Sequence, residues 1–388
     1  MKDIIIVGAG LSGLSLAFRL QQEQPHLNIQ VLEKNLSFAS NKTWSFHGGD
    51  VENIKNWKEI ISHHWKTYNV RFSYEREINQ DYYSISSDSF FKIMKNKLVS
   101  SLSFGVDVIE INNQSVRTKE NIILNAKVVI DARSNDQISF KDLKKNGCGF
   151  QKFVGLEFKT KFPHKISVPI LMDATVEQKD GFRFMYVLPY NENTLLVEDT
   201  RYSNTEDINL KEIELEIFKY IQNKNLQIEA ILRTEQGVLP IPISTPFLSQ
   251  GEKIKIGADA GFFHPVTGYS FLWVARISDE LAKIKNPNPE NYLNIIRKLK
   301  KECKQNERFY LLLNKMMFHA SDSTNRYKIF ERFYKFSDHT IDRFYSSKIN
   351  MFDYLKILIG RPPISVFAAL KVLRKKDNNL LLKEVGEP

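Results

Sequence analysis

A glycine-rich segment near the N-terminus has the spacing of a dinucleotide-binding loop. Gly8-Ala9-Gly10-Leu11-Ser12-Gly13 follows a short apolar run and opens a stretch with helical spacing, and Glu33 lies 20 residues beyond Gly13. Gly8 permits a tight turn, Gly10 a close backbone approach to a pyrophosphate, and Gly13 close packing of a helix on a strand. The helix N-terminus offers N–H groups to phosphates, and Glu33 can accept hydrogen bonds from ribose hydroxyls. The segment therefore predicts a bound dinucleotide, because a ligand-free turn leaves the acidic residue unexplained.

Two later stretches extend this prediction. Val128-Val129-Ile130-Asp131-Ala132-Arg133 resembles the strand-end motif of FAD proteins of the glutathione-reductase-like superfamily. Gly257-Ala258-Asp259-Ala260-Gly261-Phe262-Phe263-His264-Pro265-Val266-Thr267-Gly268 is similar to their second flavin-binding segment, although the Asp usual after the first glycine is here Ala258. The resemblance implies FAD, and a helix-capping turn is the alternative for this segment. The residues expected to bind the cofactor are Gly8, Ala9, Gly10, Leu11, Ser12, Gly13, Glu33, Asp131, Arg133, Gly257, Asp259, Gly261, Thr267 and Gly268.

Carboxylates at the ends of apolar segments are the candidate acids. Glu198 and Asp199 follow one apolar run, and Asp173 closes another. Neighbouring residues of a strand point to opposite faces, so only one member of the pair can enter a pocket from that strand. By spacing alone, ordinary surface acids are the commoner interpretation of the pair, and a turn or cap role is open for Asp173. Arg183 and Arg201 could pair with the acids, which would lower their pKa values and argue against catalysis.

An α/β scaffold must bring these residues together. Apolar spacing predicts a β-α-β unit in the first 35 residues and a buried strand at 126–130. The unit consists of a strand at 4–7, a helix at 11–20 and a strand at 27–32. Strand-like runs recur at 153–159, 167–170, 182–188, 194–197 and 230–232, with a helix at 209–222 between them. A further strand at 253–256 precedes a helix from about Phe271, and residues 289–375 have helical spacing, with Pro362-Pro363 opening one helix.

The pattern predicts an α/β protein of three parts. Residues 1–150 and 241–288 are expected to form a discontinuous, glutathione-reductase-like FAD-binding Rossmann domain. Residues 151–240 are expected to form an antiparallel-sheet substrate domain, and 289–388 a helical C-terminal region. Residues 281–388 carry 22 Lys and Arg but 11 Asp and Glu, whereas residues 1–280 are nearly balanced with 33 and 34. Basic charge among aromatic residues fits a solvated helical face, a nucleic-acid surface or contact with anionic lipid.

Composition and motifs exclude several classes of protein. No apolar run approaches the ~18 residues of a transmembrane helix, and the strand pattern Asp3–Val7 at the start predicts no signal peptide. The two cysteines, Cys148 and Cys303, cannot make a disulfide framework and fit a reducing cytosol. His47 and His264 lack metal-ligand spacing, so we expect no metal. Without a nucleophile elbow or a P-loop, acyl transfer and nucleotide hydrolysis are set aside.

Several motifs, in order along nearly the whole chain, resemble the bacterial lycopene β-cyclases. The segment just after the second expected strand, the central segment, the acidic signature and the flavin segment lacking its first Asp all match that family. The motifs that carry the resemblance are Asn41-Lys42-Thr43-Trp44-Ser45-Phe46-His47, Pro169-Ile170-Leu171-Met172-Asp173-Ala174-Thr175, Gly181-Phe182-Arg183-Phe184-Met185-Tyr186-Val187-Leu188-Pro189, Leu196-Val197-Glu198-Asp199-Thr200, His264-Pro265-Val266-Thr267-Gly268-Tyr269-Ser270, Arg332-Phe333-Tyr334, Arg343-Phe344-Tyr345 and Gly360-Arg361-Pro362-Pro363.

The resemblance implies a flavin-dependent cyclisation without net redox change. Such enzymes close the ψ ends of lycopene into β-ionone rings, giving γ-carotene and then β-carotene, with reduced FAD and with NAD(P)H as the reductant. Protonating an alkene needs a neutral acid in a dry pocket, because alkenes are very weak bases. The resemblance favours a catalytic role for the acidic pair over that of ordinary surface acids. It implies Glu198, with Asp199, as the catalytic site. It implies substrate contacts at Trp44, Phe46, Asp173, Phe184, Tyr186, His264, Pro265 and Tyr269, although core packing is the alternative for each aromatic.

The substrate implied by the resemblance also bears on location and on competing functions. Lycopene dissolves in bilayers, so a cytoplasmic enzyme must meet it at the inner face of the cell membrane, and the basic C-terminal region suits that contact. The partners expected are lycopene, γ-carotene and a lipid surface, and no nucleic acid. The alternative function is an FAD-dependent oxidoreductase acting on a lipid, such as a hydroxylase or a polyprenyl or geranylgeranyl reductase. A non-catalytic flavoprotein or a nucleic-acid binder is the third possibility.

Overall fold

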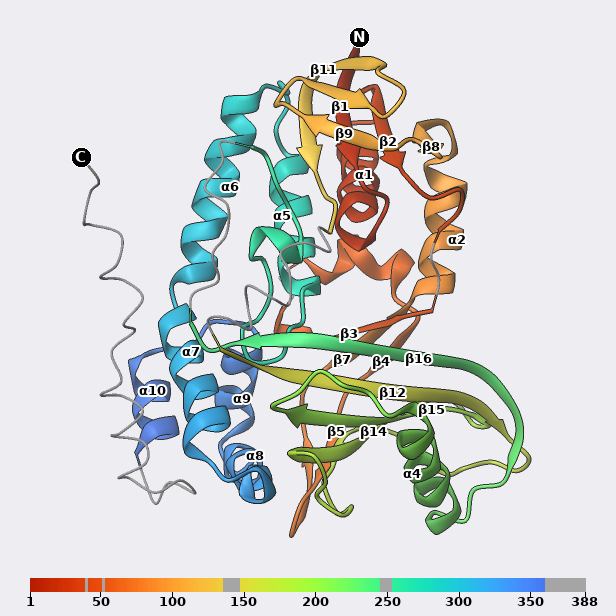
Figure 1. Cartoon of the computed structure of the whole chain (residues 1–388), viewed down its shortest axis with the longest axis vertical. Helices are drawn as coiled ribbons and strands as arrows, with labels where there is room; N and C mark the ends of the chain where they lie inside the picture. The colour runs from red at the N-terminus through yellow and green to blue at the C-terminus, as the bar shows by residue number, and fades with distance from the viewer. Residues whose placement is uncertain (39–40, 51–52, 135–146, 245–252, 360–388) are drawn as a thin grey trace, which may run out of the picture.

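The computed structural model describes residues 1–38, 41–50, 53–134, 147–244 and 253–359. An α/β unit lies at the end that holds the N-terminus, a broad antiparallel sheet lies below it, and C-terminal helices lie beside that sheet (Figure 1). This arrangement is the fold class expected from the sequence: a Rossmann-type domain, an antiparallel-sheet unit and a helical C-terminal region.

The α/β unit is built on a six-stranded sheet with the order β8-β2-β1-β11-β10-β9. Its first four strands run parallel, and β9 and β10 form an antiparallel meander on β11. Ile4 and Ile6 face the helices while Ile5 and Val7 face the meander, so the first strand is apolar throughout instead of alternating. The strands are β1 (Lys2–Val7), β2 (Ile29–Glu33), β8 (Leu102–Phe104), β9 (Val108–Ile111), β10 (Ser115–Thr118) and β11 (Ile123–Asp131).

Helices from both ends of the described chain cover one face of this sheet. The central pair are α1 and α5, which pack on each other in the largest hydrophobic core. A buried ion pair between Arg19 Nε and Asp279 Oδ1, 2.6 Å long, joins them, and Trp57 donates to the same carboxylate. The helical elements of this unit are α1 (Leu11–Glu23), η1 (Gly48–Asp50), η2 (Ile54–Ile60), α2 (Ser87–Lys97), η3 (Val99–Ser101), η4 (Ala258–Ala260), α5 (Phe271–Ala282) and α6 (Pro289–Lys304).

The second unit is a seven-stranded sheet with the order β16-β12-β15-β14-β13-β5-β6. One face is covered by α4 (Leu210–Asn223), which buries Ile213 and Ile217 on it, and the other face carries an aromatic core shared with the C-terminal helices. Two of its strands, β5 and β6, come from residues 68–78, outside the 151–240 stretch expected to supply this sheet. The strands are β5 (Tyr68–Arg71), β6 (Glu75–Ile78), β12 (Cys148–Thr160), β13 (Ile170–Asp173), β14 (Phe182–Asn191), β15 (Thr194–Ser203) and β16 (Ile228–Pro242).

A small three-stranded sheet, β3-β7-β4, connects the two units. Its strands are β3 (Thr43–His47), β7 (Tyr82–Ser86) and β4 (His63–Trp65). The hydroxyl of Tyr186 in the large sheet donates to Ser45 Oγ at 2.8 Å and lies 3.0 Å from the hydroxyl of Tyr82, so the outer strand β3 and the central strand β7 both contribute to the contact. This contact brings residues 43–47 and 82–86 over the face of the large sheet that is opposite to α4.

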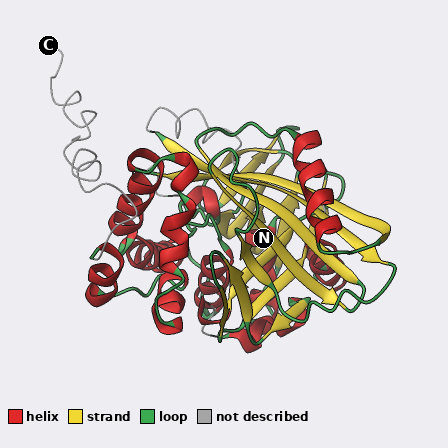
Figure 2. Ribbon diagram, turned by 90° about the horizontal axis from the view of Figure 1, so that it is seen from below, coloured by secondary structure: helices red, strands yellow, loops and turns green. Residues whose placement is uncertain are grey.

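The C-terminal helices are grouped on one side of the large sheet (Figure 2). Among the described residues, no helix is both long and apolar enough to cross a membrane. The helix expected to open at Pro362-Pro363 lies outside the described residues. The helices after α6 are α7 (Glu307–Lys315), η5 (Met316–Ala320), η6 (Ser323–Asn325), α8 (Tyr327–Phe333), α9 (Asp338–Tyr345) and α10 (Met351–Leu358).

Candidate active site and cofactor cradle

The loop between β1 and α1 has the shape that its glycines predict. Gly8 has a φ of +105°, a conformation that favours glycine. A Cβ on Gly13 would lie 2.0 Å from the carbonyl oxygen of Gly8, so the helix approaches the strand too closely for any side chain. A Cβ on Gly10 would meet no atom within 4 Å, which leaves open space where the loop faces outward at the helix N-terminus.

The second glycine segment lies against the first. Gly257, with a φ of +89°, places its missing Cβ 3.0 Å from Ser12 Oγ. The residues before it run beside β11 through a single parallel bridge between Lys255 and Asp131, so the strand expected at 253–256 is reduced to that contact. Segments about 250 residues apart therefore form one cradle at the carboxyl ends of β1 and β11, the edge where nucleotides bind in this architecture.

The acidic residues expected in the cradle make definite contacts. Glu33 ends β2, and its Oε2 accepts the Ala9 N–H at 2.9 Å, which fixes the glycine loop on the next strand. Asp131 pairs with Arg133 at 2.9 Å, and Arg133 also donates to the Val108 carbonyl at 2.7 Å. Contact of Glu33 with a ribose stays a prediction, as do the cofactor contacts of Asp131 and Asp259.

The adjacent acids Glu198 and Asp199 in β15 have opposite environments. Asp199 points to the α4 face, where it is fully buried and receives Arg183 Nε at 2.8 Å and Arg201 Nε at 3.0 Å. Glu198 points to the other face, and within the described residues it forms no ion pair. The two arginines that could have lowered the pKa of a catalytic acid therefore pair with Asp199, as strand alternation requires.

Glu198 is held in a form suited to donate a proton. Its carboxyl is 9% exposed, and its Oε1 accepts a hydrogen bond from Thr200 Oγ1. Burial, followed by repulsion from Glu235, raises its pKa to about 8, so the group is mostly protonated at neutral pH. A neutral carboxylic acid in a low-dielectric site is the chemical requirement for protonating a weak base.

Glu198 lies at a small cavity walled largely by aromatic side chains. The cavity holds about 30 Å³, room for one or two water molecules. Its walls come from the three-stranded sheet, the large sheet, the segment with Thr267 and Tyr269, and the C-terminal helical region. The lining residues are His47, Tyr82, Gln151, Leu171, Met172, Phe184, Tyr186, Glu198, Thr200, Tyr202, Thr267, Tyr269, Tyr334 and Tyr345.

Four residues assigned from the sequence to substrate or cofactor meet at this cavity: Phe184, Tyr186, Thr267 and Tyr269. Trp44 and Phe46 do not line it. They pack in the core of the α/β unit, Trp44 against Phe90 and Phe46 against Phe271.

Asp173 belongs to a separate polar cluster. It is fully buried at the end of β13, where it accepts from the Tyr220 hydroxyl at 2.8 Å and lies 3.3 Å from Lys224 Nζ. Although burial opposes ionisation, hydrogen bonds from Thr175 and the charge of Lys224 leave its pKa below the usual value. Tyr220 lies in α4 and Lys224 directly follows it, so Asp173 lies on the sheet face away from Glu198, and its lowered pKa keeps it ionised.

His264 and Pro265 lie behind the cavity wall. His264 Nδ1 accepts the Val266 N–H, and Nε2 lies 3.0 Å from the Phe344 carbonyl, to which it donates. Burial lowers the His264 pKa to about 4, so the ring is neutral and ties the flavin-type segment to α9. The carbonyl of Pro265 accepts from Asn314, which ties the same segment to α7.

An apolar groove adjoins the cavity on the side of the C-terminal helices. It has a volume of about 100 Å³ and shares Tyr202, Thr267 and Tyr345 with the cavity wall. These three side chains are the partition between the groove and Glu198. The remaining lining residues are Val266, Leu313, Asn314, Met316, Met317, Ile329, Phe330, Arg332, Phe333, Phe336, Phe344, Ile357 and Leu358.

Sequence reasoning gave a site role to five of the fourteen lining residues. Strand alternation from Glu198 could have found Thr200 and Tyr202. Gln151, whose buried Oε1 has no hydrogen-bond partner among the described residues, faces the cavity from β12 and carries no local signal. The others missed are His47, Tyr82, Leu171, Met172, Tyr334 and Tyr345.

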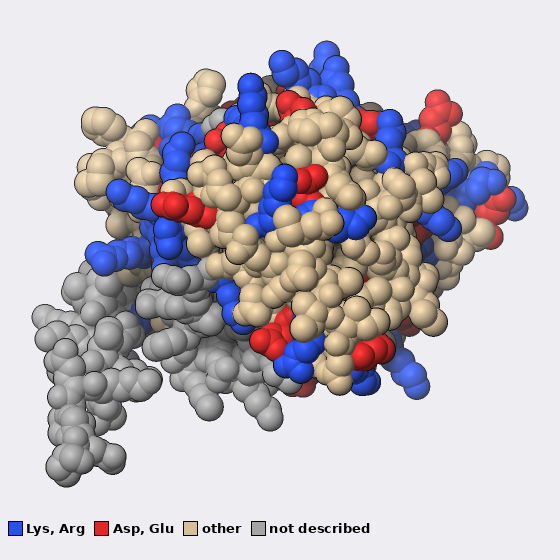
Figure 3. Space-filling view, turned by 90° about the horizontal axis from the view of Figure 1, so that it is seen from above, with Lys and Arg blue, Asp and Glu red and all other residues tan. Residues whose placement is uncertain are grey.

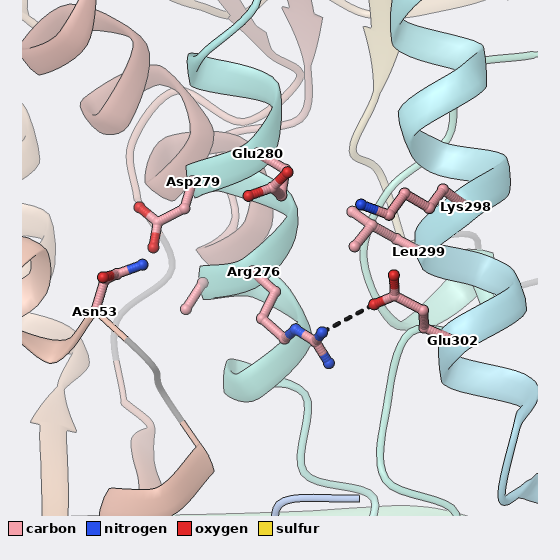
Figure 4. A pocket seen from close by; sticks show the side chains of 8 residues that line it. Asn53, Arg276, Asp279, Glu280, Lys298, Leu299 and Glu302 are labelled. Carbon is pink, nitrogen blue, oxygen red and sulfur yellow. Dashed lines mark hydrogen bonds and ion pairs between the residues drawn. The ribbon is translucent and has the colours of Figure 1, made fainter. Parts of the chain in front are cut away.

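A larger polar hollow lies between α5 and α6 and shares no residue with the cavity of Glu198. Arg276 and Glu302 form an ion pair of 2.8 Å across it, whereas Asp279 points away toward Asn53 (Figure 4). Asp279 is engaged by Arg19, so its carboxylate serves helix packing and not a reaction.

The fold is that of flavin-dependent oxidoreductases and halogenases. Solved structures with the same arrangement include a thermophilic tryptophan halogenase from Streptomycin violaceusniger (13% identity, TM-score 0.60, 94% of this chain and 92% of that one). A geranylgeranyl bacteriochlorophyll reductase-like protein from Thermoplasma acidophilum has 18% identity and a TM-score of 0.52, covering 97% and 96%. A flavin-dependent brominase has 14% identity and a TM-score of 0.53, covering 81% and 89%.

Sequence comparison narrows this class to one family. Residues 3–371 match the family described as lycopene cyclase protein. A lycopene beta-cyclase of Pantoea ananas is 36% identical over 380 residues, 96% of this chain and 97% of that protein. A lycopene beta-cyclase of Pseudescherichia vulneris is 33% identical over 371 residues, 94% and 95% of the two chains. The chain therefore belongs to the lycopene cyclase family.

Proposed function

We propose that this protein is a lycopene β-cyclase that closes the acyclic ψ ends of lycopene into β-ionone rings, giving γ-carotene and β-carotene, an isomerisation without net redox change. The observation that carries the proposal is the neutral, buried carboxyl of Glu198 at an aromatic cavity next to an apolar groove. The relatives named lycopene beta-cyclase support the choice of substrate.

Glu198 is the proposed proton donor. The carboxyl O–H adds its proton to the terminal trisubstituted alkene, and a tertiary cation forms. The neighbouring double bond attacks that cation and closes the ring. A ring proton then passes to solvent to give the β-ionone ring, and one proton from solvent restores the neutral Glu198 carboxyl, so the reaction is a net isomerisation. Burial supports this role because a dry site both keeps the acid neutral and prevents water from trapping the cation.

Aromatic faces support the positive charge between these steps. Phe184, Tyr186 and Tyr202 present rings from the floor of the sheet, and ring faces attract cations. Burial raises the pKa of Tyr186 well above its ordinary value, so its hydroxyl stays protonated and is a poor nucleophile. Asp199 is proposed to act only by holding β15 in place through its two arginines.

FAD is the proposed cofactor, in its reduced form, with NAD(P)H as the reductant. The cradle fits an extended dinucleotide because Gly10 leaves space beside a helix N-terminus and Gly257 adjoins Ser12. Thr267 and Gln151, whose Oε1 has no partner among the described residues, line the same cavity as Glu198 and offer polar contacts to a ring system. When bound, a reduced flavin supplies negative charge that stabilises a neighbouring carbocation.

The substrate chain is proposed to reach Glu198 through the groove under the C-terminal helices. Ile357 and Leu358 of α10 line this groove, and the outward side of α10 exposes Met351 and Phe352, which are 68% and 75% exposed. An exposed apolar helix at the groove, in the basic part of the chain, suits contact with an anionic bilayer. We therefore propose a cytoplasmic protein that docks on the inner face of the cell membrane.

A nucleic-acid partner has less support. On the face seen from above, Lys and Arg side chains are dispersed among acidic and uncharged residues and form no continuous stripe (Figure 3). Nucleic-acid binding surfaces gather basic side chains along a track.

The experiment that tests the function is expression in a bacterium that accumulates lycopene. We expect β-carotene of unchanged mass, and no β-carotene from Glu198→Gln, which retains flavin. Unchanged lycopene with the wild-type chain would contradict the proposal, and cyclisation by Glu198→Gln would transfer the proton to another acid. A product of altered mass would favour the oxidoreductase alternative, suggested by the structural likeness to a reductase-like protein.

A further inference from the structure

A second buried carboxyl lies across the sheet from Glu198. Glu198 of β15 is paired with Gly155 of β12, and Gly155 is in turn paired with Glu235 of β16. Residues directly opposite on neighbouring strands share one face of the sheet, so the two carboxyl side chains flank a glycine on the cavity side. A Cβ on Gly155 would lie 3.1 Å from Glu235 Cγ and 3.5 Å from Glu198 Cβ. Both acidic side chains therefore lie next to the space above Gly155, which has no side chain of its own.

The two carboxyls have unequal partners. Glu235 is 5% exposed and receives Arg233 Nη1 at 2.7 Å and Thr43 Oγ1 at 3.0 Å. Among the described residues, Glu198 receives a hydrogen bond only from the neutral hydroxyl of Thr200. When two neighbouring carboxyls repel each other, the one beside a cation ionises first and the proton stays on the other.

We propose that Glu235 is a positioning residue for the cyclisation: its carboxylate, fixed by Arg233 and Thr43 across Gly155, keeps the reactive proton on Glu198. The inference rests on the proposed role of Glu198 as the acid. The fixed negative charge of Glu235 acts together with burial to keep Glu198 protonated. The same charge opposes ionisation of Glu198, so the acid regains a proton from solvent before the next turnover.

The electrostatic surroundings of both groups agree with this division. Repulsion from Glu235 is the second cause, after burial, of the raised pKa of Glu198, and Asp199 adds a smaller repulsion. Burial also raises the pKa of Glu235, but the charge of Arg233 opposes that effect. The other titratable or charged groups that face the pair are Glu157 and Arg233 at the Glu235 end, Tyr190 beside them, and Tyr186, Tyr82, Tyr202, Tyr269, Tyr334, Tyr345 and His47 around the cavity.

The test is the pH dependence of cyclisation by the purified, flavin-loaded protein with lycopene in liposomes. Activity requires protonated Glu198, so it falls as the pH rises through the pKa of that group. Glu235→Gln removes the repulsion while Arg233 stays paired with Glu157, so we expect the alkaline limb of the pH–activity profile to move about one to two pH units toward acid. Glu235→Asp should restore most of the limb. The matched control is Glu157→Gln, which also removes a carboxylate from Arg233 but lies two residues beyond Gly155 along β12. The alkaline limb of its pH–activity profile should stay in place.

A second measurement separates this inference from the proposed function. The carboxyl band that Glu198→Gln removes from the infrared spectrum reports protonation directly, and its titration should shift in Glu235→Gln as the activity does. If Glu198→Gln is inactive but neither limb nor band moves in Glu235→Gln, the role of Glu235 is refuted and that of Glu198 stands. If Glu198→Gln remains active, the proposed function fails instead. Should Glu235→Gln not fold, Gly155→Ala, whose Cβ displaces Glu235, must give a smaller shift in the same direction.

Discussion

Glu198→Gln has a consequence for stability that does not depend on activity. Gln is close in shape to the protonated acid and stays neutral at every pH. In the wild type the Glu198 pKa of about 8 lies above the ordinary value of 4.5, so the unfolded chain ionises first and unfolding releases a proton. The wild type therefore loses stability as the pH rises from the unfolded pKa toward the folded one, and the variant escapes this loss.

The size of the effect follows from the two pKa values. At pH 7 the unfolded chain is almost fully ionised at this residue while the folded chain is mostly protonated. Linkage then gives a loss of about 3 kcal/mol at pH 7 and close to zero near pH 4. The free energy of unfolding of Glu198→Gln, minus that of the wild type, should increase by this amount over the interval.

Chemical denaturation of both proteins between about pH 4 and pH 8 measures this difference. Glu157→Gln, from the same sheet face but with a carboxylate that is partly exposed and paired with Arg233, is the matched control. A stability difference for Glu198→Gln that is constant over the pH range would refute the neutral acid, whatever the variant's activity. The same result would remove the physical basis of the proposed proton transfer.

Two further predictions concern the cradle and the proposed membrane contact of α10. Gly10→Ala should fold with its stability changed by less than about 1 kcal/mol, because its Cβ meets no atom, but it should bind FAD at least about tenfold more weakly. Gly13→Ala should instead be destabilised by about 1–3 kcal/mol or more. Flavin titration and thermal unfolding measure the two effects, and a normal FAD affinity of Gly10→Ala would mean that the pyrophosphate binds elsewhere. Phe352→Ser should reduce flotation with anionic vesicles several-fold, while Leu215→Ser on exposed α4 should not; equal flotation would exclude α10 as the docking face.

The parts of the fold that depend on local pattern could be predicted from the sequence. The β-α-β unit was predictable because Gly8, Gly13 and the apolar run before them leave a strand few alternatives. The role of residues 68–78 as an edge of the large sheet could not be foreseen, because their pairing with β13 joins segments about 100 residues apart. Trp44 and Phe46 carry the same apolar signal whether they line a core or a tunnel, and only the packing of α2 and α5 decides for the core.

The candidate acid illustrates how far local reasoning extends. Alternation in a strand separates Glu198 from Asp199 and places Arg201 on the face of Asp199, but the sequence could not say which of the two faces borders the pocket. That choice depends on the side of the sheet covered by α4, which packs on Val197 and leaves Glu198 facing the other way. The contribution of Glu235 is less visible still, because it arises from the register of two long strand pairs around Gly155. Because antiparallel pairing repeats every second residue, a shift of one residue in β16 would carry Glu235 to the α4 face and place Arg233 and Gly237 there too. The register of β16 on β12, and not the identity of residue 198 alone, therefore determines whether the carboxyl at position 198 stays protonated for the proposed proton transfer.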